Sequence, residues 1–311
     1  MIKNMIYICL VLTSIHPLVG QELSPKKVPY LNAHVVNTLE TMRSPFIRTN
    51  LDFNMGLATS SSFTTESVQL GDSALLNLNN SLVYVGLSMN YSQRIKDWAG
   101  FFFRVDYSAR IGAGVQSILT QGINTIVTTE TGVKFKVSSS DRHRLSMYYS
   151  LTNTQASLVD VSSYINDIIN DKPNPSVTQK TTSLLSGGGL SFSYALSHWL
   201  AFNSDAKMAY GETLDRGQSK WQYFVGGNTD FYFGELIQIP VSLVLGGTVN
   251  TQVNTFSTQG DITANAYVKL AYAGSDAFFV SLSTYYGRTP IEKDNRHVGV
   301  VGFLFSTSLF F

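Results

Sequence analysis

Apolar and polar residues alternate with a period of two through most of this chain. Twelve segments of about ten residues show the pattern, and tight turns alternate with longer polar connections between them. A period of two places successive side chains on opposite faces of a β-strand. The pattern predicts an all-β fold, an antiparallel up-and-down β-barrel of about twelve strands. The expected strands are 46–58, 81–94, 100–112, 125–138, 143–153, 181–196, 199–211, 220–234, 238–252, 261–273, 277–287 and 298–311.

The two faces of the expected strands differ in polarity. Phe101, Phe103 and Val105 share one face, for example, whereas Arg104 and Asp106 share the other. An apolar outer face and a polar lumen are typical of membrane-spanning β-barrels; the alternative, a soluble β-sandwich, carries more Lys and Glu on its outer face. The lumen-lining charges predicted in this way are Arg48, Asp52, Arg104, Asp106, Arg110, Glu130, Lys134, Lys136, Asp205, Lys207, Asp230 and Lys269.

Low charge and a short apolar leader indicate an exported membrane protein. Charged residues make up 14% of the chain, against about 25% in soluble proteins, and a net charge of +1 gives no basis for binding nucleic acid. Beyond the leader, no apolar run approaches the ~18 residues of a membrane helix. Residues 1–20 combine Lys3, an apolar run and Pro17, which predicts a cleaved signal peptide. Cys9, the only cysteine, lies within it, so we expect no disulfide, no thiolate metal site and no cofactor.

The last expected strand ends the chain on an aromatic residue. Phe303, Phe305, Leu309 and Phe311 lie on its apolar face. Such a terminal strand resembles the recognition signal of Gram-negative outer-membrane β-barrels, which the barrel-assembly machinery reads. The resemblance is to the broad class of porins and channels, extends over the whole mature chain and singles out no specific family. It implies the bacterial outer membrane, with periplasmic termini and short turns, and contacts with lipid, lipopolysaccharide and that machinery.

Two stretches depart from the strand pattern. Leu31 and Met42 begin and end a run in which apolar residues recur at helical spacing. Residues 21–44 are therefore expected to form a segment with a short helix, either a periplasmic cap or a plug within the barrel 45–311. In the longest connection, 154–180, apolar residues again recur at helical spacing, which predicts one extracellular loop that contains a helix.

Three consecutive glycines, Gly187, Gly188 and Gly189, fall within an expected strand. Glycine in a strand allows a kink, a bulge or the close approach of another part of the chain. One hypothesis is a lateral gate to lipid, because such a feature would resemble the fatty-acid channel family. The other is a bend in the barrel or room for an inward loop.

Signals for catalysis are poor. Residues 71–74 read Gly-Asp-Ser-Ala, which resembles the nucleophile block of GDSL hydrolases but lies in a long loop. Ser140, Asp141 and His143 share one tight turn, too close in sequence to form a catalytic triad. We therefore expect no enzyme activity, and a lipid-modifying enzyme is the third hypothesis for function.

The predicted lumen charges leave two leading hypotheses. Seven are basic and five acidic, which fits a water-filled path with a modest preference for small anions. The same charges could instead pair and fill the barrel, because twelve strands lie between filled barrels of about 8 strands and open ones of about 16–18. The sequence thus predicts a passive channel for small solutes. The alternative is a closed barrel that serves as a structural or accessory subunit and presents loops to a protein partner.

Overall fold

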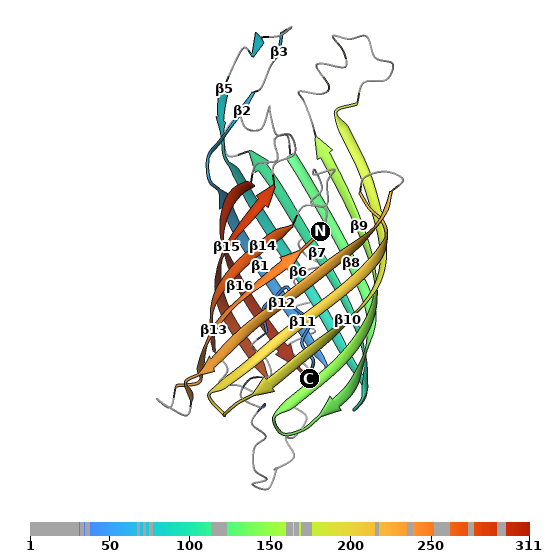
Figure 1. The fold of residues 1–311 in the computed structure, drawn as a ribbon, viewed down its shortest axis with the longest axis vertical. Helices are drawn as coiled ribbons and strands as arrows, with labels where there is room; N and C mark the ends of the chain where they lie inside the picture. Colours follow the sequence, from blue (N-terminus) through green and yellow to red (C-terminus); the bar gives the residue numbers. More distant parts are fainter. Residues whose placement is uncertain are drawn as a thin grey trace, which may run out of the picture.

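The computed structural model describes residues 31, 34, 38–66, 69–70, 73–74, 77–112, 123–159, 164, 168, 176–214, 218–234, 239–251, 262–272, 277–290 and 297–311. Twelve strands of this part of the chain close into one antiparallel barrel, which β1 completes by pairing with β16 (Figure 1). The prediction of a closed twelve-stranded barrel is confirmed. The barrel strands are β1 (Asn50–Ser60), β6 (Leu82–Lys96), β7 (Ala99–Gly112), β8 (Ile123–Ser139), β9 (His143–Val159), β10 (Thr178–Ala195), β11 (Leu200–Glu212), β12 (Ser219–Tyr232), β13 (Val241–Asn250), β14 (Thr263–Tyr272), β15 (Phe278–Pro290) and β16 (His297–Phe310).

The connections differ in length at the two ends of the barrel. Tight turns such as 97–98 and 140–142 lie where β1 begins and β16 ends, which we name the short-turn end. The opposite, long-loop end carries connections such as 61–81. Within 61–81, where the sequence predicted a polar loop, short strands continue beyond the barrel (Figure 1). They pair as β2 (Phe63–Glu66) with β5 (Asn77–Asn80) and β3 (Gln69–Leu70) with β4 (Ser73–Ala74).

The two faces of the barrel wall differ as the alternation predicts. On the outside, Leu87, Met147 and Leu282 are 49%, 48% and 55% exposed, whereas the inward Ser146 and Ser283 are fully buried. A closed barrel satisfies every backbone ladder internally, and an apolar outer band needs lipid to cover it. The wall is therefore built to span a membrane with its strands. Among the described residues, no helix is long and apolar enough to cross one.

The first strand begins later than predicted, because residues 45–49 are irregular and β1 starts at Asn50. The helix expected over 31–42 is wrong for residues 38–42, which form a turn, while Leu31 and His34 lie in 3₁₀ turns. In the long 160–177 connection, Tyr164 and Ile168 are helical. The remainder of the predicted loop helix, and the expected signal peptide, lie outside the described residues.

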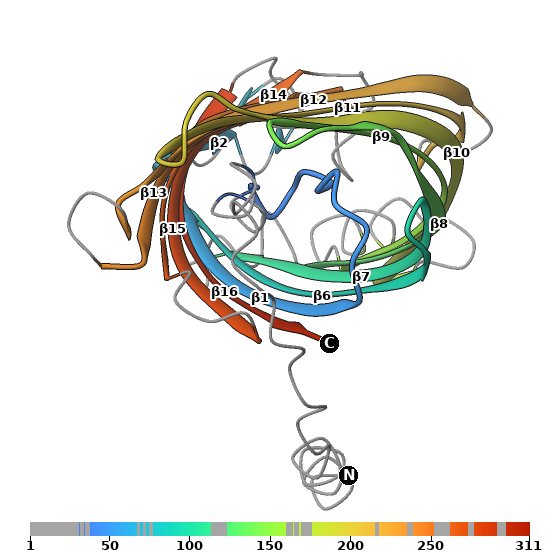
Figure 2. The same ribbon diagram turned by 90° about the horizontal axis from the view of Figure 1, so that it is seen from below.

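Residues 38–46 lie inside the barrel, and we name them the inner segment. Figure 2, viewed along the barrel, shows this stretch crossing the space that the strands enclose. Leu39, Met42, Arg43 and Phe46 are between 1% and 8% exposed. A turn rather than a strand or helix leaves backbone polar groups that need partners, so the barrel wall must supply them.

Candidate functional site: the barrel interior

Arg43 is the centre of the inner segment's contacts with the wall. Its guanidinium forms an ion pair with Glu130 of β8 and donates to Asn90 Oδ1 of β6 at 3.0 Å. Its backbone N–H donates to Asp205 Oδ2 of β11 at 2.9 Å. The guanidinium also lies over the Phe102 ring, 4.0 Å from its centroid. One residue thus ties the segment to four strands, through a buried charge that is paired, as burial of a charge requires.

Glu40 binds the opposite side of the wall. Its Oε1 accepts from Lys269 Nζ of β14 at 3.0 Å and from Ser283 and Ser306 Oγ, each at 3.1 Å. Lys269 Nζ also donates to the Thr38 carbonyl at 2.9 Å. The side chains of Lys269 and Glu40 are only 3% and 7% exposed. Burial in a low-dielectric interior strengthens such a pair but makes removal of either partner costly.

The end of the inner segment is held through its backbone carbonyls. Lys134 Nζ of β8 donates to the Ser44 carbonyl at 2.5 Å and to the Phe46 carbonyl at 3.4 Å. Ser146 Oγ of β9 donates to the Pro45 carbonyl at 2.6 Å. These contacts satisfy carbonyl groups that have no regular secondary structure to pair with.

A buried histidine lies near the short-turn end. His34 Nδ1 is 2.5 Å from Asp230 Oδ2 of β12, its Nε2 donates to the Ser197 carbonyl at 3.2 Å, and both His34 and Asp230 are fully buried. The Tyr232 ring meets the imidazole edge-on at 6.4 Å. With this pair included, His34 and residues 38–46 hydrogen-bond to nine of the twelve barrel strands. These strands are β6, β7, β8, β9, β11, β12, β14, β15 and β16.

Part of the interior is apolar. Leu39 and Met42 of the inner segment pack with buried Val244 and Tyr267 of β13 and β14. Partly buried side chains extend this cluster: Phe224, Tyr285 and Leu304. Leu39 and Met42 thus pack against β12 to β16, where Glu40 also binds, whereas the Arg43 guanidinium contacts β6, β7 and β8.

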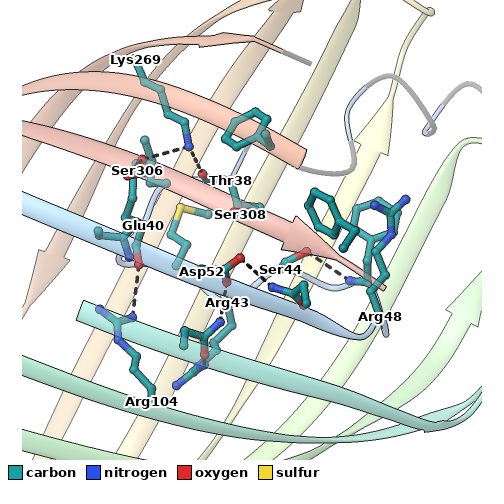
Figure 3. Close-up of a pocket in the computed structure, with 18 of the residues that line it drawn as sticks. Thr38, Glu40, Arg43, Ser44, Arg48, Asp52, Arg104, Lys269, Ser306 and Ser308 are labelled. Carbon is teal, nitrogen blue, oxygen red and sulfur yellow. Dashed lines mark hydrogen bonds and ion pairs between the residues drawn. The ribbon is translucent and has the colours of Figure 1, made fainter. Parts of the chain in front are cut away.

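Two cavities flank the inner segment. The short-turn cavity, of about 110 Å³, reaches Asn50 at the start of β1 and Phe310 at the end of β16. Figure 3 shows residues that line this cavity, among them Glu40, Asp52 and Lys269. The long-loop cavity, of about 180 Å³, reaches Asn250, which ends β13 at the long-loop end of the barrel. Arg43 and Arg104 line both cavities. The two cavities are therefore adjacent at these two side chains.

The cavities differ in charge. Five basic and two acidic side chains line the short-turn cavity, a formal excess of three positive charges: Arg43, Arg48, Arg104, Lys134 and Lys269 with Glu40 and Asp52. Three basic and three acidic side chains line the long-loop cavity, with no excess: Arg43, Arg104 and Lys207 with Asp106, Glu130 and Asp205.

The predicted lumen charges divide into those that hydrogen-bond to His34 or residues 38–46 and those that do not. Six form such hydrogen bonds: Arg104, Glu130, Lys134, Asp205, Asp230 and Lys269. Arg104 does so through Nη1, which donates to the Glu40 carbonyl at 3.2 Å. Lys207 reaches the same network through Glu130, 2.6 Å from its Nζ.

The other predicted charges interact within the wall or near its ends. Asp106 accepts from Arg104 Nε at 2.8 Å. Asp52 accepts from two neutral amides, Asn50 and Asn90, each at 2.7 Å. Arg48 lies over the rings of Phe46 and Phe310, at 5.9 and 5.4 Å. Arg110 pairs in register with Tyr84, and Lys136 is half-buried near the short-turn end of β8 and lines neither cavity.

The expected assembly signal lies on the outer face of β16 and at the chain end. Phe303, Phe305 and Phe311 are 57%, 46% and 63% exposed, and Leu309 is half-buried. Their apolar side chains thus belong to the surface that lipid would cover. The role of this strand in assembly stays a prediction.

Sequence reasoning missed the interior residues that carry no strand pattern, Glu40, Arg43 and His34, and two inward aromatics. Phe102 is 1% exposed and meets the Tyr148 ring edge-on at 6.2 Å. Tyr148 OH donates to Asp205 Oδ1 at 3.1 Å.

The glycines were the sequence feature from which this close packing inside the barrel could have been predicted. A Cβ at Gly189 would overlap the Tyr148 ring, and a Cβ at Gly226 would lie 2.8 Å from Met42 Cγ. The ladders of β10 with β9 and with β11 run unbroken through Gly187 and Gly188. The glycines therefore leave room for inward side chains, and the unbroken pairing argues against a lateral gate at this point.

No family model matches this chain, and no curated protein matches it in sequence. Among solved structures, the toluene transporter TodX of Pseudomonas putida matches at 10% identity and a TM-score of 0.45, over 85% of this chain and 90% of that one. The KdgM porin in complex with disordered oligogalacturonate matches at 8% and 0.45, over 84% and 99%. The transport unit of the autotransporter AIDA-I from Escherichia coli matches at 9% and 0.47, over 91% and 98%. At these identities and TM-scores the matches carry no argument about function.

Proposed function

We propose that this protein is an outer-membrane channel for the passive diffusion of small solutes, closed by its inner segment in this structure. The observation that carries the proposal is that the two cavities, one on each side of the inner segment, are adjacent at the same two residues. Arg43 and Arg104 line the interior space on both sides of the inner segment. Hydrogen bonds and ion pairs hold the segment, and such contacts can break and re-form. If they broke and the segment shifted, the two cavities would join into one polar path.

The orientation is part of the proposal. The short-turn end and both termini would face the periplasm, and the long loops the outside, as in bacterial outer-membrane barrels generally. Residues 1–20 would be removed on export. The surroundings would be lipid and lipopolysaccharide, and the barrel-assembly machinery would handle the chain during insertion.

Selectivity in this channel would come from the charges along the path. A solute that enters the long-loop cavity would meet balanced ion pairs such as Lys207 with Glu130. Beyond the segment it would meet the positive excess of the short-turn cavity. Rings of fixed charge favour ions of the opposite sign, so small anions should pass in preference to cations.

A reversible tether tests whether the inner segment closes the path. Met42 faces Gly226 of β12, where a Cβ would lie 2.8 Å from Met42 Cγ. The M42C/G226C variant should therefore form a disulfide, and Cys9 of the expected signal peptide is the only native cysteine. In planar bilayers we expect the oxidised variant to stay silent and the reduced variant to show discrete conductance steps.

Met42→Cys alone is the matched control, since it loosens the same contact without a tether. Its conductance should not depend on the reductant. A folded barrel that stays silent after reduction would contradict the channel proposal. Steps of equal size in the oxidised and reduced double variant would contradict closure by the inner segment.

The second candidate is a permanently closed barrel that serves as a structural or accessory subunit. The hydrogen bonds of His34 and residues 38–46 to nine strands favour it, since so many contacts resist displacement. This function predicts a silent barrel and a protein partner that co-purifies in gentle detergent. A lipid-modifying enzyme has less support: His143 bonds Ser140 Oγ at 2.7 Å in an exposed turn, and we propose no catalysis there.

A further inference from the structure

The carboxylates of the short-turn cavity already have hydrogen-bond donors. Glu40 Oε1 accepts from Lys269 and two serines, as described above. Asp52 accepts from the amides of Asn50 and Asn90 through its two oxygens, each at 2.7 Å. Of the five basic side chains that line the cavity, Lys269 pairs with Glu40, Arg43 with Glu130 and Arg104 with Asp106. The basic side chains to consider as donors to a ligand are therefore Lys134 and Arg48.

Lys134 is the clearest such donor. An ammonium group has three N–H donors. Two of them go to neutral backbone carbonyls, those of Ser44 and Phe46, at 2.5 and 3.4 Å. The residue is 7% exposed and lines the cavity. A buried ammonium gains most from a charge-assisted bond, and its third N–H can make one to an anion in the cavity.

Arg48 is held in a form suited to the same ligand. Its guanidinium lies over the rings of Phe46 and Phe310, at 5.9 and 5.4 Å. These contacts restrict the position of the group, and its N–H donors form a planar fork that matches the oxygens of carboxylate or phosphate. Figure 3 shows Arg48 and Lys269 at opposite sides of the cavity, with Glu40 on the side of Lys269 and Asp52 between Lys269 and Arg48.

We infer that the short-turn cavity is a binding site for a small oxyanion, a phosphate or carboxylate group, held by Lys134 and Arg48. The volume of about 110 Å³ has room for one such group with some water. The inference deepens the proposed function by naming the class of solute. It rests on that function only for passage of the solute, because binding needs no open path.

The test is calorimetric titration of the full mature protein in detergent, first with inorganic phosphate and separately with acetate. We expect saturable binding to one site for at least one of the two probes, and the probe that binds identifies the source of the oxyanion. The double variant Lys134→Gln, Arg48→Gln should weaken that binding at least tenfold. Arg48→Gln alone should weaken it severalfold, since Lys134 remains.

The matched control is Lys96→Gln with Arg94→Gln. It removes the same charges at the same end of the barrel, from exposed side chains outside the lumen. Binding in this control should stay within twofold of the native protein. Folding of every variant is checked by heat modifiability on gels. If the Lys134 variant fails to fold, Arg48→Gln still tests the site, because Arg48 precedes β1 and stacks on rings rather than pairing in a ladder.

No binding of either probe to the native protein would overturn the inference, as would an equal loss in the control. Failure of this inference and failure of the channel proposal remain distinguishable. A silent barrel that binds phosphate keeps the site and removes the channel. A conducting barrel that binds neither probe keeps the channel and removes the site.

Discussion

The two cavities share Arg43 and Arg104 yet differ in what their charges do. In the long-loop cavity basic and acidic groups are equal in number, and Lys207 and Arg43 both pair with Glu130. In the short-turn cavity basic groups exceed acidic ones by three, and Lys134 bonds carbonyl oxygens of the inner segment. Groups of both cavities hold the segment in place, and the basic excess that would attract an anion lies in the short-turn cavity. One short segment thus divides a single lumen into two compartments that differ in their balance of charge.

The largest effect is expected from removing the inner segment, which separates the two cavities. Deleting residues 31–43 removes the side chains of Glu40 and Arg43 and should merge the cavities into one continuous path. We expect at least a tenfold rise in mean conductance in planar bilayers. Folding of the deletion variant is judged by heat modifiability. A folded variant that conducts no more than the native protein would contradict the separation of the two cavities by the inner segment.

Arg43→Met should have the next largest effect, because it leaves Glu130 buried with Lys207 as its remaining cation. Breaking a buried ion pair costs about 3–5 kcal/mol, and each 1.4 kcal/mol is about tenfold in an equilibrium. The undocked fraction of the inner segment should therefore rise by about two to three and a half orders of magnitude. Cleavage within residues 38–46 by a protease added at the short-turn end measures this, with Arg94→Met as control.

Gly189→Ala tests the side-chain packing beside the long-loop cavity. The new methyl group would overlap the Tyr148 ring and displace its hydroxyl from Asp205. Overpacking of this kind costs about 1–3 kcal/mol, so the heat-modifiability midpoint should fall. Gly188→Ala is the control, since its Cβ would meet only the Tyr148 carbonyl, at 3.2 Å. Equal midpoints for the two variants would mean that the packing of Tyr148 contributes little.

Arg48→Gln should have the smallest effect, confined to the short-turn cavity. One partly exposed charge contributes about 1 kcal/mol or less, so the anion-to-cation permeability ratio should fall by less than about fivefold. The reversal potential under a salt gradient measures this ratio. Arg94→Gln, outside the lumen, should leave it unchanged. A shift toward anions in Arg48→Gln would contradict the assignment of Arg48 to the path.

The barrel wall could be predicted because its information is local. Period-two alternation and turn residues are readable within ten or fifteen positions, so the expected strand 125–138 differs little from β8 at Ile123–Ser139. The largest error at a strand start came at β1. There the chain must still leave the lumen after Phe46, and tertiary contacts override the local pattern.

The inner segment could not be predicted in the same way. Arg43 meets Glu130 across 87 positions of sequence, and His34 meets Asp230 across 196. Such pairs depend on the register of the whole barrel, which no short window contains. Helical spacing in 31–42 was a weak signal, because the apolar side chains face the wall from a turn instead.

The short link between the inner segment and the wall has a kinetic consequence. Only residues 47–49 separate the docked Phe46 from Asn50, the first residue of β1. Three residues reach at most about 10 Å. A released segment would stay beside its own docking groups at an effective concentration of about millimolar or more. Reclosure would then be a unimolecular event, independent of the amount of protein present, and any open state would be brief unless a bound solute held the segment aside.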